Sequence, residues 1–240
     1  MGHKKLVKFQ AIEGYSNVLQ YPEGMVGKWN EFFGNSNPIT LELACGKGEY
    51  SVGLGRQNPN RNYIGVDIKG NRIYRGAKTA LDEGLKNVAF LRTQIDKITQ
   101  YFGHNEVSEI WIVFADPFLK KPSNRLTHQR FLYLYSRILV PGGIIRLKTD
   151  SPDLFYSTLE VIEEQHCTIH EKIEDIYKDG MPEGPLSIQT YYEGLHLADG
   201  RTIYYVAFSL PEGDIKLPER YGRKFQELFG DEAEDKPLES

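Results

Sequence analysis

The chain has 240 residues, of which 40% are hydrophobic and 26% charged; it is long enough for one substantial domain and too apolar to be wholly disordered. Its 29 basic and 33 acidic residues give a net charge of −4, which argues weakly against a nucleic-acid binder. No apolar stretch resembles a signal peptide or a membrane span, and two cysteines cannot build a disulfide framework, so we expect a cytoplasmic protein without membrane contact.

Residues 1–37 are mixed in character and are interpreted as an N-terminal extension. The first clear element is ITLEL, residues 39–43, an apolar run that predicts a buried strand. Gly46 and Gly48 follow it, and glycines at such a point let the backbone turn tightly and approach a ligand. Ser51 stands where the third glycine of a dinucleotide pattern belongs, so this pair is weak evidence by itself.

Two acids accompany the glycines and make the pattern more informative. Glu42 lies in the first strand, and Asp67 closes the second, residues 62–68. A carboxylate after the second strand can accept both hydroxyls of a ribose, in nicotinamide and S-adenosylmethionine enzymes alike. Glu42 favours S-adenosylmethionine, whose amino acid part is cationic, because a carboxylate repels a pyrophosphate. A structural turn with incidental acids is the alternative.

The following elements alternate between strand and helix. In chain order they are a helix at 71–83, strands at 87–92 and 109–114, a helix at 127–138 ending at 141–143, a strand at 143–149 and a helix at 152–165. Short apolar strands separated by helices predict an α/β fold with a doubly wound, mostly parallel sheet. Ligand sites in such sheets lie beyond the carboxyl ends of the strands.

The strand at 109–114 ends in an unusual combination of side chains. The sequence FADPFLKKPSNR presents one carboxylate, Asp116, then the ring of Phe118, then Lys120 and Lys121. Pro117 biases Asp116 toward an extended backbone, which directs the carboxylate away from the strand. A plain turn at the end of a strand is the alternative interpretation.

Charge is segregated along the chain. Residues 118–150 carry seven basic side chains and one acid, whereas the last ten residues carry five acids and one lysine. The seven are Lys120, Lys121, Arg125, Arg130, Arg137, Arg146 and Lys148. A basic face is therefore compatible with the low net charge, although a solvated surface gives the same pattern.

The chain ends with a loop at 178–188, a strong strand at 202–210 and an acidic C-terminal extension at 211–240, which we expect to be disordered. His166, Cys167 and His170 lie close in sequence but lack a second pair of ligands, so no metal site is predicted.

Several of these stretches together resemble the bacterial tRNA (guanine-N7-)-methyltransferases. They are LELACGKGEYSVGLGRQNPNRNYIGVDIKGNRI, DEGLKNVAFLR, IWIVFADPFLKK, GGIIRLKTD and the later IQTYYEG. The resemblance implies a Rossmann-like class I methyltransferase domain with a seven-stranded sheet at 38–210. It also implies methyl transfer from S-adenosylmethionine to N7 of a guanine in the tRNA variable loop, by a monomer or homodimer.

The resemblance also assigns site residues. Cofactor-binding positions fall on Glu42, Gly46, Gly48, Asp67, Gln94 and Asp116, with Asp116 also catalytic. Substrate-binding positions fall on Lys120, Asp150, Thr190 and Glu193. Purely structural roles are the alternatives for three of these residues. Thr190 and Glu193 have the spacing of a helix capping box, and Asp150 suits a helix cap or a surface pair with Lys148.

The chain departs from the family's pattern at three points. Gln94 replaces an aspartate, Phe118 replaces a tryptophan, and the basic loop after Lys121 is shorter and less charged. An amide at Gln94 still bonds adenine, though less strongly than a carboxylate. We expect the nearby Arg125, His128 and Arg130 to supply part of the missing charge.

Guanine N7 has a lone pair and no proton, so methylation there requires alignment and charge stabilisation rather than a general base. Asp116 suits that task, Phe118 suits stacking, and the lysines suit phosphates. Two other functions are considered: a non-catalytic RNA-binding protein on the same fold, and a nicotinamide oxidoreductase, which Glu42 and the missing third glycine disfavour.

Overall fold

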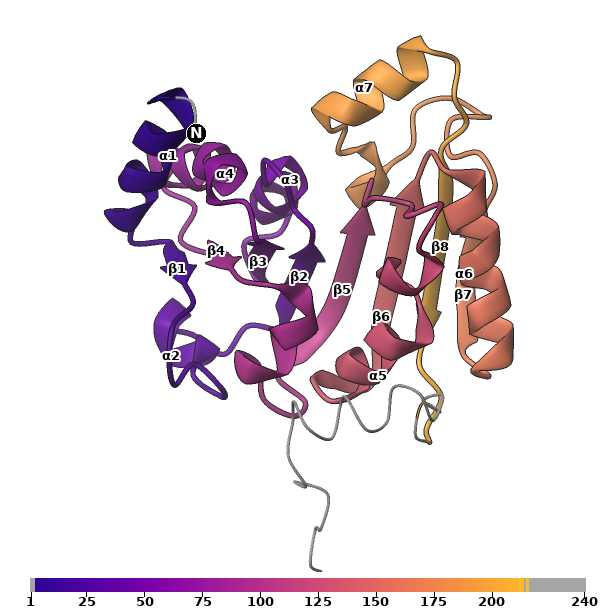
Figure 1. Ribbon diagram of the computed structural model, residues 1–240, viewed down its shortest axis with the longest axis horizontal. Coiled ribbons are helices and arrows are strands. Elements are labelled where there is room, and N and C mark those ends of the chain that lie inside the picture. The colour runs from indigo at the N-terminus through magenta and orange to yellow at the C-terminus, as the bar shows by residue number, and fades with distance from the viewer. Residues whose placement is uncertain (1–2, 214, 216–240) are drawn as a thin grey trace, which may run out of the picture.

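The computed structural model describes residues 3–213 and 215, which form a sheet of eight strands in the order β1-β4-β3-β2-β5-β6-β8-β7 (Figure 1). The strands are β1 (Val18–Gln20), β2 (Ile39–Leu43), β3 (Asn62–Asp67), β4 (Val88–Arg92), β5 (Val107–Val113), β6 (Leu139–Thr149), β7 (Thr168–Ile173) and β8 (Tyr204–Ser209). All neighbours are parallel except β8, which runs antiparallel to β6 and β7. The α/β, mostly parallel fold expected from the alternating pattern is confirmed.

The described residues contain seven α-helices and three short 3₁₀ helices. They are α1 (His3–Glu13), α2 (Trp29–Phe33), α3 (Glu49–Gln57), α4 (Gly70–Asp82), α5 (Gln129–Ser136), α6 (Pro152–Glu164), α7 (Tyr191–Ala198), η1 (Ile95–Gln100), η2 (Pro122–Asn124) and η3 (Gly184–Ser187). No helix in the described part of the chain is long and apolar enough to cross a membrane. The predicted acidic tail falls outside the described residues.

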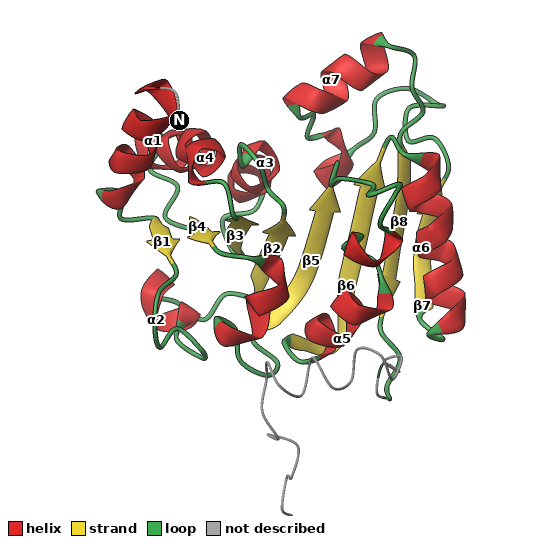
Figure 2. Ribbon diagram, in the orientation of Figure 1, coloured by secondary structure: helices red, strands yellow, loops and turns green. Residues whose placement is uncertain are grey.

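The sheet has one strand more than the seven expected. Strand β1 adds to the edge through parallel pairing of Val18 with Phe90 and of Gln20 with Arg92. Three residues are too few to show the alternation of polar and apolar side chains by which strands are recognised. The N-terminal segment therefore contributes to the sheet, and its helix α1 packs on α4 (Figure 2).

Two hydrophobic clusters hold helices to the two faces of the sheet. One joins the strands to α2, α5 and α6 through residues such as Trp29, Tyr135 and Phe155. The other joins them to α3 and α4 through residues such as Tyr50 and Ile73. Burial of large apolar side chains on both faces is what fixes a doubly wound sheet, because each face needs its own layer of helices.

The prediction that a helix ends at residues 141–143 was wrong. Helix α5 ends at Ser136, and residues 141–143 lie inside the long strand β6. There the pairing with β5 shifts, from Val107 opposite Leu139 to Glu109 opposite Ile144. Proline and glycine ordinarily interrupt regular structure, and here they form an irregularity within a strand rather than a loop before it.

Helix α7 lies apart from the two layers, beyond the carboxyl ends of β5 and β6 (Figure 1). Its first residue, Tyr191, donates its backbone N–H to Glu49 at the start of α3 (3.0 Å). Near its other end, the ring of His196 lies 5.5 Å from that of Phe114, directly after β5. The helix thus bridges the loop after β2 and the end of β5, which are the places where the predicted site residues lie.

Candidate functional site

The carboxyl ends of β2, β3 and β5 lie side by side, because β2 pairs with β3 on one side and β5 on the other. Residues that follow these strands meet at one edge of the sheet whatever their separation in sequence. The predicted donor-site residues at or near these three ends are Glu42, Gly46, Gly48, Asp67 and Asp116. Gln94 follows the adjoining strand β4.

The Glu42 carboxylate is 4% exposed and faces the first turn of α3. Its Oε2 accepts a hydrogen bond from the Ser51 backbone N–H at 2.7 Å and a second from the Ser51 hydroxyl. Burial raises the pKa of this carboxyl to about 8 despite the Ser51 hydrogen bonds, which lower it. Burial therefore favours the protonated form of Glu42, and a cation bound beside it would favour the carboxylate.

Gly46 and Gly48 are each glycine for a different physical reason. Gly46 has φ +54°, and a Cβ added to it would meet only the Ala44 carbonyl oxygen, at 4.0 Å. Gly48 has φ +68°, and an added Cβ would lie 2.3 Å from the ring of Phe90. Gly46 therefore leaves space for the close approach of a ligand that the sequence led us to expect. At Gly48 the space that a side chain would need is filled by Phe90 of the protein's own core.

The Asp67 carboxylate ties two loops together. Its Oδ2 accepts from the backbone N–H of Gly46 at 2.9 Å, and its Oδ1 accepts from that of Lys69 at 2.7 Å. The side chain is 7% exposed and lies at the end of β3. Each oxygen has two lone pairs, so the carboxylate retains capacity to accept from hydroxyl groups.

The end of β4 is partly covered by the N-terminal segment. The Arg92 guanidinium lies 4.6 Å from the ring centroid of Phe9 and 5.2 Å from that of Tyr21. Gln94, two residues further on, is exposed and directly precedes η1. Sequence reasoning missed the contribution of Phe9 and Tyr21, because neither belongs to a motif and both reach this strand end only through the fold.

Asp116 is exposed at the end of β5. Its Oδ1 accepts the backbone N–H of Phe118 at 2.9 Å, and no described residue donates to its Oδ2. Phe114 and Phe118 flank it with φ of +49° and +42°, and Ala44 after the neighbouring β2 has φ +57°. Positive φ costs energy in residues other than glycine and clusters at functional sites, where it directs side chains.

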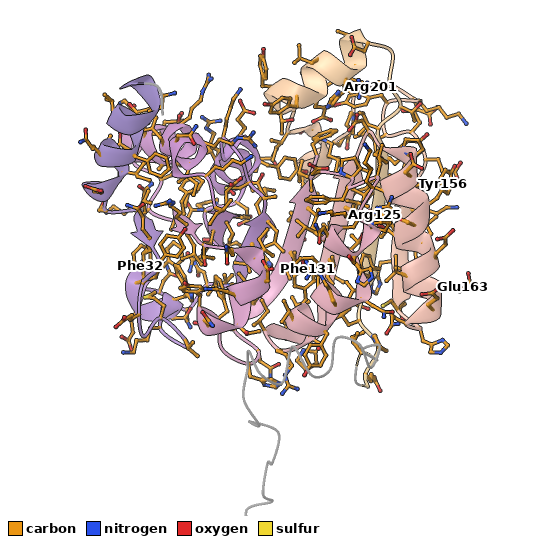
Figure 3. All side chains as sticks on the ribbon, viewed as in Figure 1. Phe32, Arg125, Phe131, Tyr156, Glu163 and Arg201 are labelled. Atoms are coloured by element: carbon orange, nitrogen blue, oxygen red, sulfur yellow. The ribbon has the colours of Figure 1, made fainter. Side chains whose placement is uncertain are left out.

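The residues expected to supply positive charge after Asp116 differ in their surroundings. Lys120 and Lys121 are exposed, whereas Arg125 (labelled in Figure 3) donates its Nε to the Pro117 carbonyl at 2.8 Å. His128 caps α5, its Nδ1 accepting from the backbone N–H of Arg130 at 3.2 Å. This contact orients the His128 ring at the start of α5.

Thr190 and Glu193 form the capping box of α7, with both of its hydrogen bonds present. Glu193 is also fully buried and pairs with Lys148 Nζ at 2.7 Å. Lys148 Nζ donates further to the carbonyls of Leu186 and Ile188, and Tyr177 donates its hydroxyl to Glu193 at 2.7 Å. Burial lowers the pKa of Lys148, while Glu193 acts in the opposite direction.

This pair corrects one interpretation of the sequence. Lys148 is wholly buried and is no surface partner of Asp150. A lysine inside the apolar strand GIIRLKT was itself the missed signal, because a buried ammonium requires a partner. Asp150 does not cap α6 either, since the Ser151 hydroxyl accepts from Leu154 N–H at 3.2 Å.

Asp150 lies at the end of β6 and pairs with α7 and the segment after it. Its Oδ2 lies 2.7 Å from Nη1 of Arg201, which Figure 3 labels beside α7, and 3.6 Å from Nδ1 of His196. The predicted substrate-binding residues thus differ in how far they are exposed to solvent. Lys120 is exposed, Asp150 is half-buried in an ion pair, and Glu193 has no exposed surface.

The charged edge of the sheet suits one class of ligand. The side chains at the predicted cofactor-binding positions described here are carboxylates and an amide. These groups accept hydrogen bonds from hydroxyl and ammonium groups. No group of three or more histidine, cysteine, aspartate or glutamate side chains among the residues described is placed to hold a metal ion. The arrangement therefore suits a cationic, hydroxyl-bearing cofactor.

Comparison with known proteins gives a consistent result. A family model described as "Putative methyltransferase" matches residues 36–206. A tRNA (guanine-N(7)-)-methyltransferase of Bacteroides fragilis (strain YCH46) is 47% identical in an alignment that covers 91% of each chain. One of Streptococcus suis (strain 05ZYH33) is 36% identical over 191 residues, which are 79% of this chain and 89% of the relative.

Solved structures with the same fold are much more distant in sequence. The 16S rRNA methyltransferase KamB superposes with a TM-score of 0.60 at 13% identity, over 77% of this chain and 94% of its own. An S-adenosylmethionine-dependent methyltransferase from Aquifex aeolicus gives 0.51 at 15% identity, over 77% and 89%. These likenesses establish the Rossmann-like class I methyltransferase fold.

Proposed function

This chain belongs to the tRNA (guanine-N(7)-)-methyltransferase family, and we propose that it methylates N7 of a guanine in the variable loop of tRNA, with Asp116 holding the reacting base. The observation that carries the role of Asp116 is its position: it is exposed at the end of β5, beside the strand whose end carries the glycine loop. The oxidoreductase and the non-catalytic RNA-binding protein are not favoured by the relatives.

The cofactor is S-adenosylmethionine, which supplies an activated methyl group on a sulfonium sulfur. The residues present suit it. Asp67 suits the ribose hydroxyls, Glu42 the cationic amino acid part, and Gln94 the adenine. The open side of Gly46, where an added Cβ meets nothing closer than 4.0 Å, leaves room for close approach of the cofactor to the backbone.

The protein's contribution to the reaction is alignment and charge stabilisation. Asp116 accepts from the N–H groups of the guanine and stabilises the positive charge that the purine gains at N7. No residue is required to remove a proton from the nucleophile, because N7 has none. The exposed Lys120 and Lys121 meet phosphates, which position the RNA without reading its sequence.

In this proposal the partner is tRNA, and the protein acts in the cytoplasm as a monomer or homodimer. In the same proposal residues 38–210 form the catalytic domain, 1–37 an N-terminal extension and 211–240 a C-terminal one. The deciding experiment incubates the protein with labelled S-adenosylmethionine and unmodified tRNA and locates the label. We expect 7-methylguanosine in the variable loop; label at another atom or no transfer contradicts the proposal.

A pH-dependent prediction follows from Glu42. The pKa of Glu42 in the folded protein is about 8, above its ordinary value of 4.5. The contribution of the protonated carboxyl to the free energy of unfolding is therefore complete below pH 4.5 and is lost as the pH rises from 4.5 to 8. The Glu42→Gln variant escapes this loss while still accepting from Ser51. We therefore expect it to gain stability relative to the wild type between pH 5 and pH 8, by up to about 3 kcal/mol at pH 7.

The same variant should bind S-adenosylmethionine about 10- to 100-fold more weakly, because the amide cannot supply the negative charge that strengthens the hydrogen bond to the cofactor's ammonium group. Chemical denaturation at several pH values and isothermal titration check the two results. A stability difference that stays constant with pH, or unchanged affinity, would contradict the role of Glu42. The matched control is Glu160→Gln, an exposed carboxyl on α6.

A further inference from the structure

Two tyrosines at the start of α7 form an exposed aromatic surface. The catalytic role proposed for Asp116 does not explain why these rings are exposed. Tyr191 is 56% exposed and Tyr192 47% exposed. Their rings are nearly perpendicular, with centroids 5.7 Å apart. Large aromatic side chains usually bury most of their area, so an exposed adjacent pair is informative.

A lysine from the glycine loop lies against this pair. Lys47 stands between Gly46 and Gly48, and its Nζ is 3.9 Å from the ring centroid of Tyr191 and 5.4 Å from that of Tyr192. The Tyr191 backbone also bonds to Glu49 at the start of α3. The tyrosine pair is thus fixed beside the predicted donor loop, at the rim of the site rather than at a remote surface.

Positive charge continues away from the pair. A cavity of about 520 Å³ between α3 and α4 has four charged residues in its lining, the cations of Lys47, Arg56 and Arg75 and the carboxylate of Glu49. Arg56 is paired with Glu83. Arg75 is exposed, and no carboxylate within residues 3–213 or at 215 pairs with it. The surface therefore combines rings with cations, the combination by which proteins bind single-stranded RNA.

We propose that one ring of the Tyr191–Tyr192 pair stacks on a nucleobase adjacent to the target guanine and the other contacts the edge of that base, while Lys47 and Arg75 bind the phosphates beside it. This rests on the proposed function, because it assumes that the guanine is held at Asp116. A guanine buried in the folded tRNA must leave its stack, and its exposed neighbour then needs a new partner. The tyrosine pair supplies one.

The first test compares the double variant Tyr191→Ala/Tyr192→Ala with Tyr191→Phe/Tyr192→Phe, which keeps the rings. Binding of unmodified tRNA is expected to weaken about 5- to 150-fold in the alanine variant, the range for one stacked base, and to change little in the phenylalanine variant. Leu195→Ala is the control, since Leu195 is 45% exposed on the same helix but is not aromatic. S-adenosylmethionine affinity should be unchanged in all three.

A second test separates stacking from a structural role. Two tRNAs each carry an abasic nucleotide, one directly before and one directly after the target guanine. At least one abasic tRNA should bind the wild type more weakly than intact tRNA does. The alanine variant should bind that abasic tRNA and intact tRNA with the same affinity. The Arg75→Gln variant should make the salt dependence shallower by about one unit of slope.

The proposal is overturned if neither abasic tRNA weakens binding to the wild type, or if the same weakening persists without the rings. It is also overturned if the alanine variant binds intact tRNA normally. Failure of the proposed function is distinguishable, because the wild type would then make no 7-methylguanosine in intact tRNA.

Discussion

The Asp116→Asn variant is expected to lose tRNA methylation, with kcat reduced about 10²- to 10³-fold, while S-adenosylmethionine still binds. The reduction is that observed when one group that stabilises a developing charge is removed from an active site. Asparagine is nearly the same size, and its carbonyl oxygen can still accept the backbone N–H of Phe118, as Asp116 Oδ1 does at 2.9 Å. The turn is kept, and only the negative charge is lost.

Single-turnover methylation of unmodified tRNA and isothermal titration with S-adenosylmethionine measure the two quantities separately. Asp116→Ala should be at least as slow, because it loses the carboxylate and the turn hydrogen bond together. Asp179→Asn serves as the control, since Asp179 is exposed in the loop before η3. Full activity in Asp116→Asn would remove Asp116 from the reaction, and loss of cofactor binding would assign it to the donor site alone.

The second large effect concerns folding stability. Replacing either member of the Lys148–Glu193 pair should cost about 3–5 kcal/mol of unfolding free energy, because the remaining charge is left buried without its partner. The pair joins β6 to α7, and Lys148 also bonds the carbonyls of Leu186 and Ile188. Its loss is therefore expected to loosen the loop that leads into α7.

The variants to compare are Lys148→Met, Glu193→Gln and the two combined, each measured by urea denaturation. We expect the combined variant to be clearly more stable than the sum of the single losses predicts, since it leaves no unpaired charge. Strictly additive losses would contradict the ion pair as the main role of Glu193. Normal stability with weaker tRNA binding in Glu193→Gln would instead support the direct substrate contact implied by the family resemblance.

Much of the fold could be predicted because its signals are local. Apolar runs marked the buried strands, and Pro152 marked the start of α6. Short or irregular elements escaped: β1 has only three residues, and Pro141 lies within β6 rather than after a helix. In both places pairing with a neighbouring strand, and not local preference, decides the conformation.

At the site, the sequence by itself determined which chemical groups are available and at which strand ends they lie. The glycine loop, Asp67 and Asp116 could be placed together because parallel strands bring their carboxyl ends to one edge. Their environments could not be predicted, since burial and partners depend on residues distant in sequence. Only the tertiary structure raises the pKa of Glu42, by burying it, and only it encloses Lys148 with Glu193. It also sets Tyr191 over Lys47, because a charge or an aromatic ring takes its role from the groups that the fold places around it.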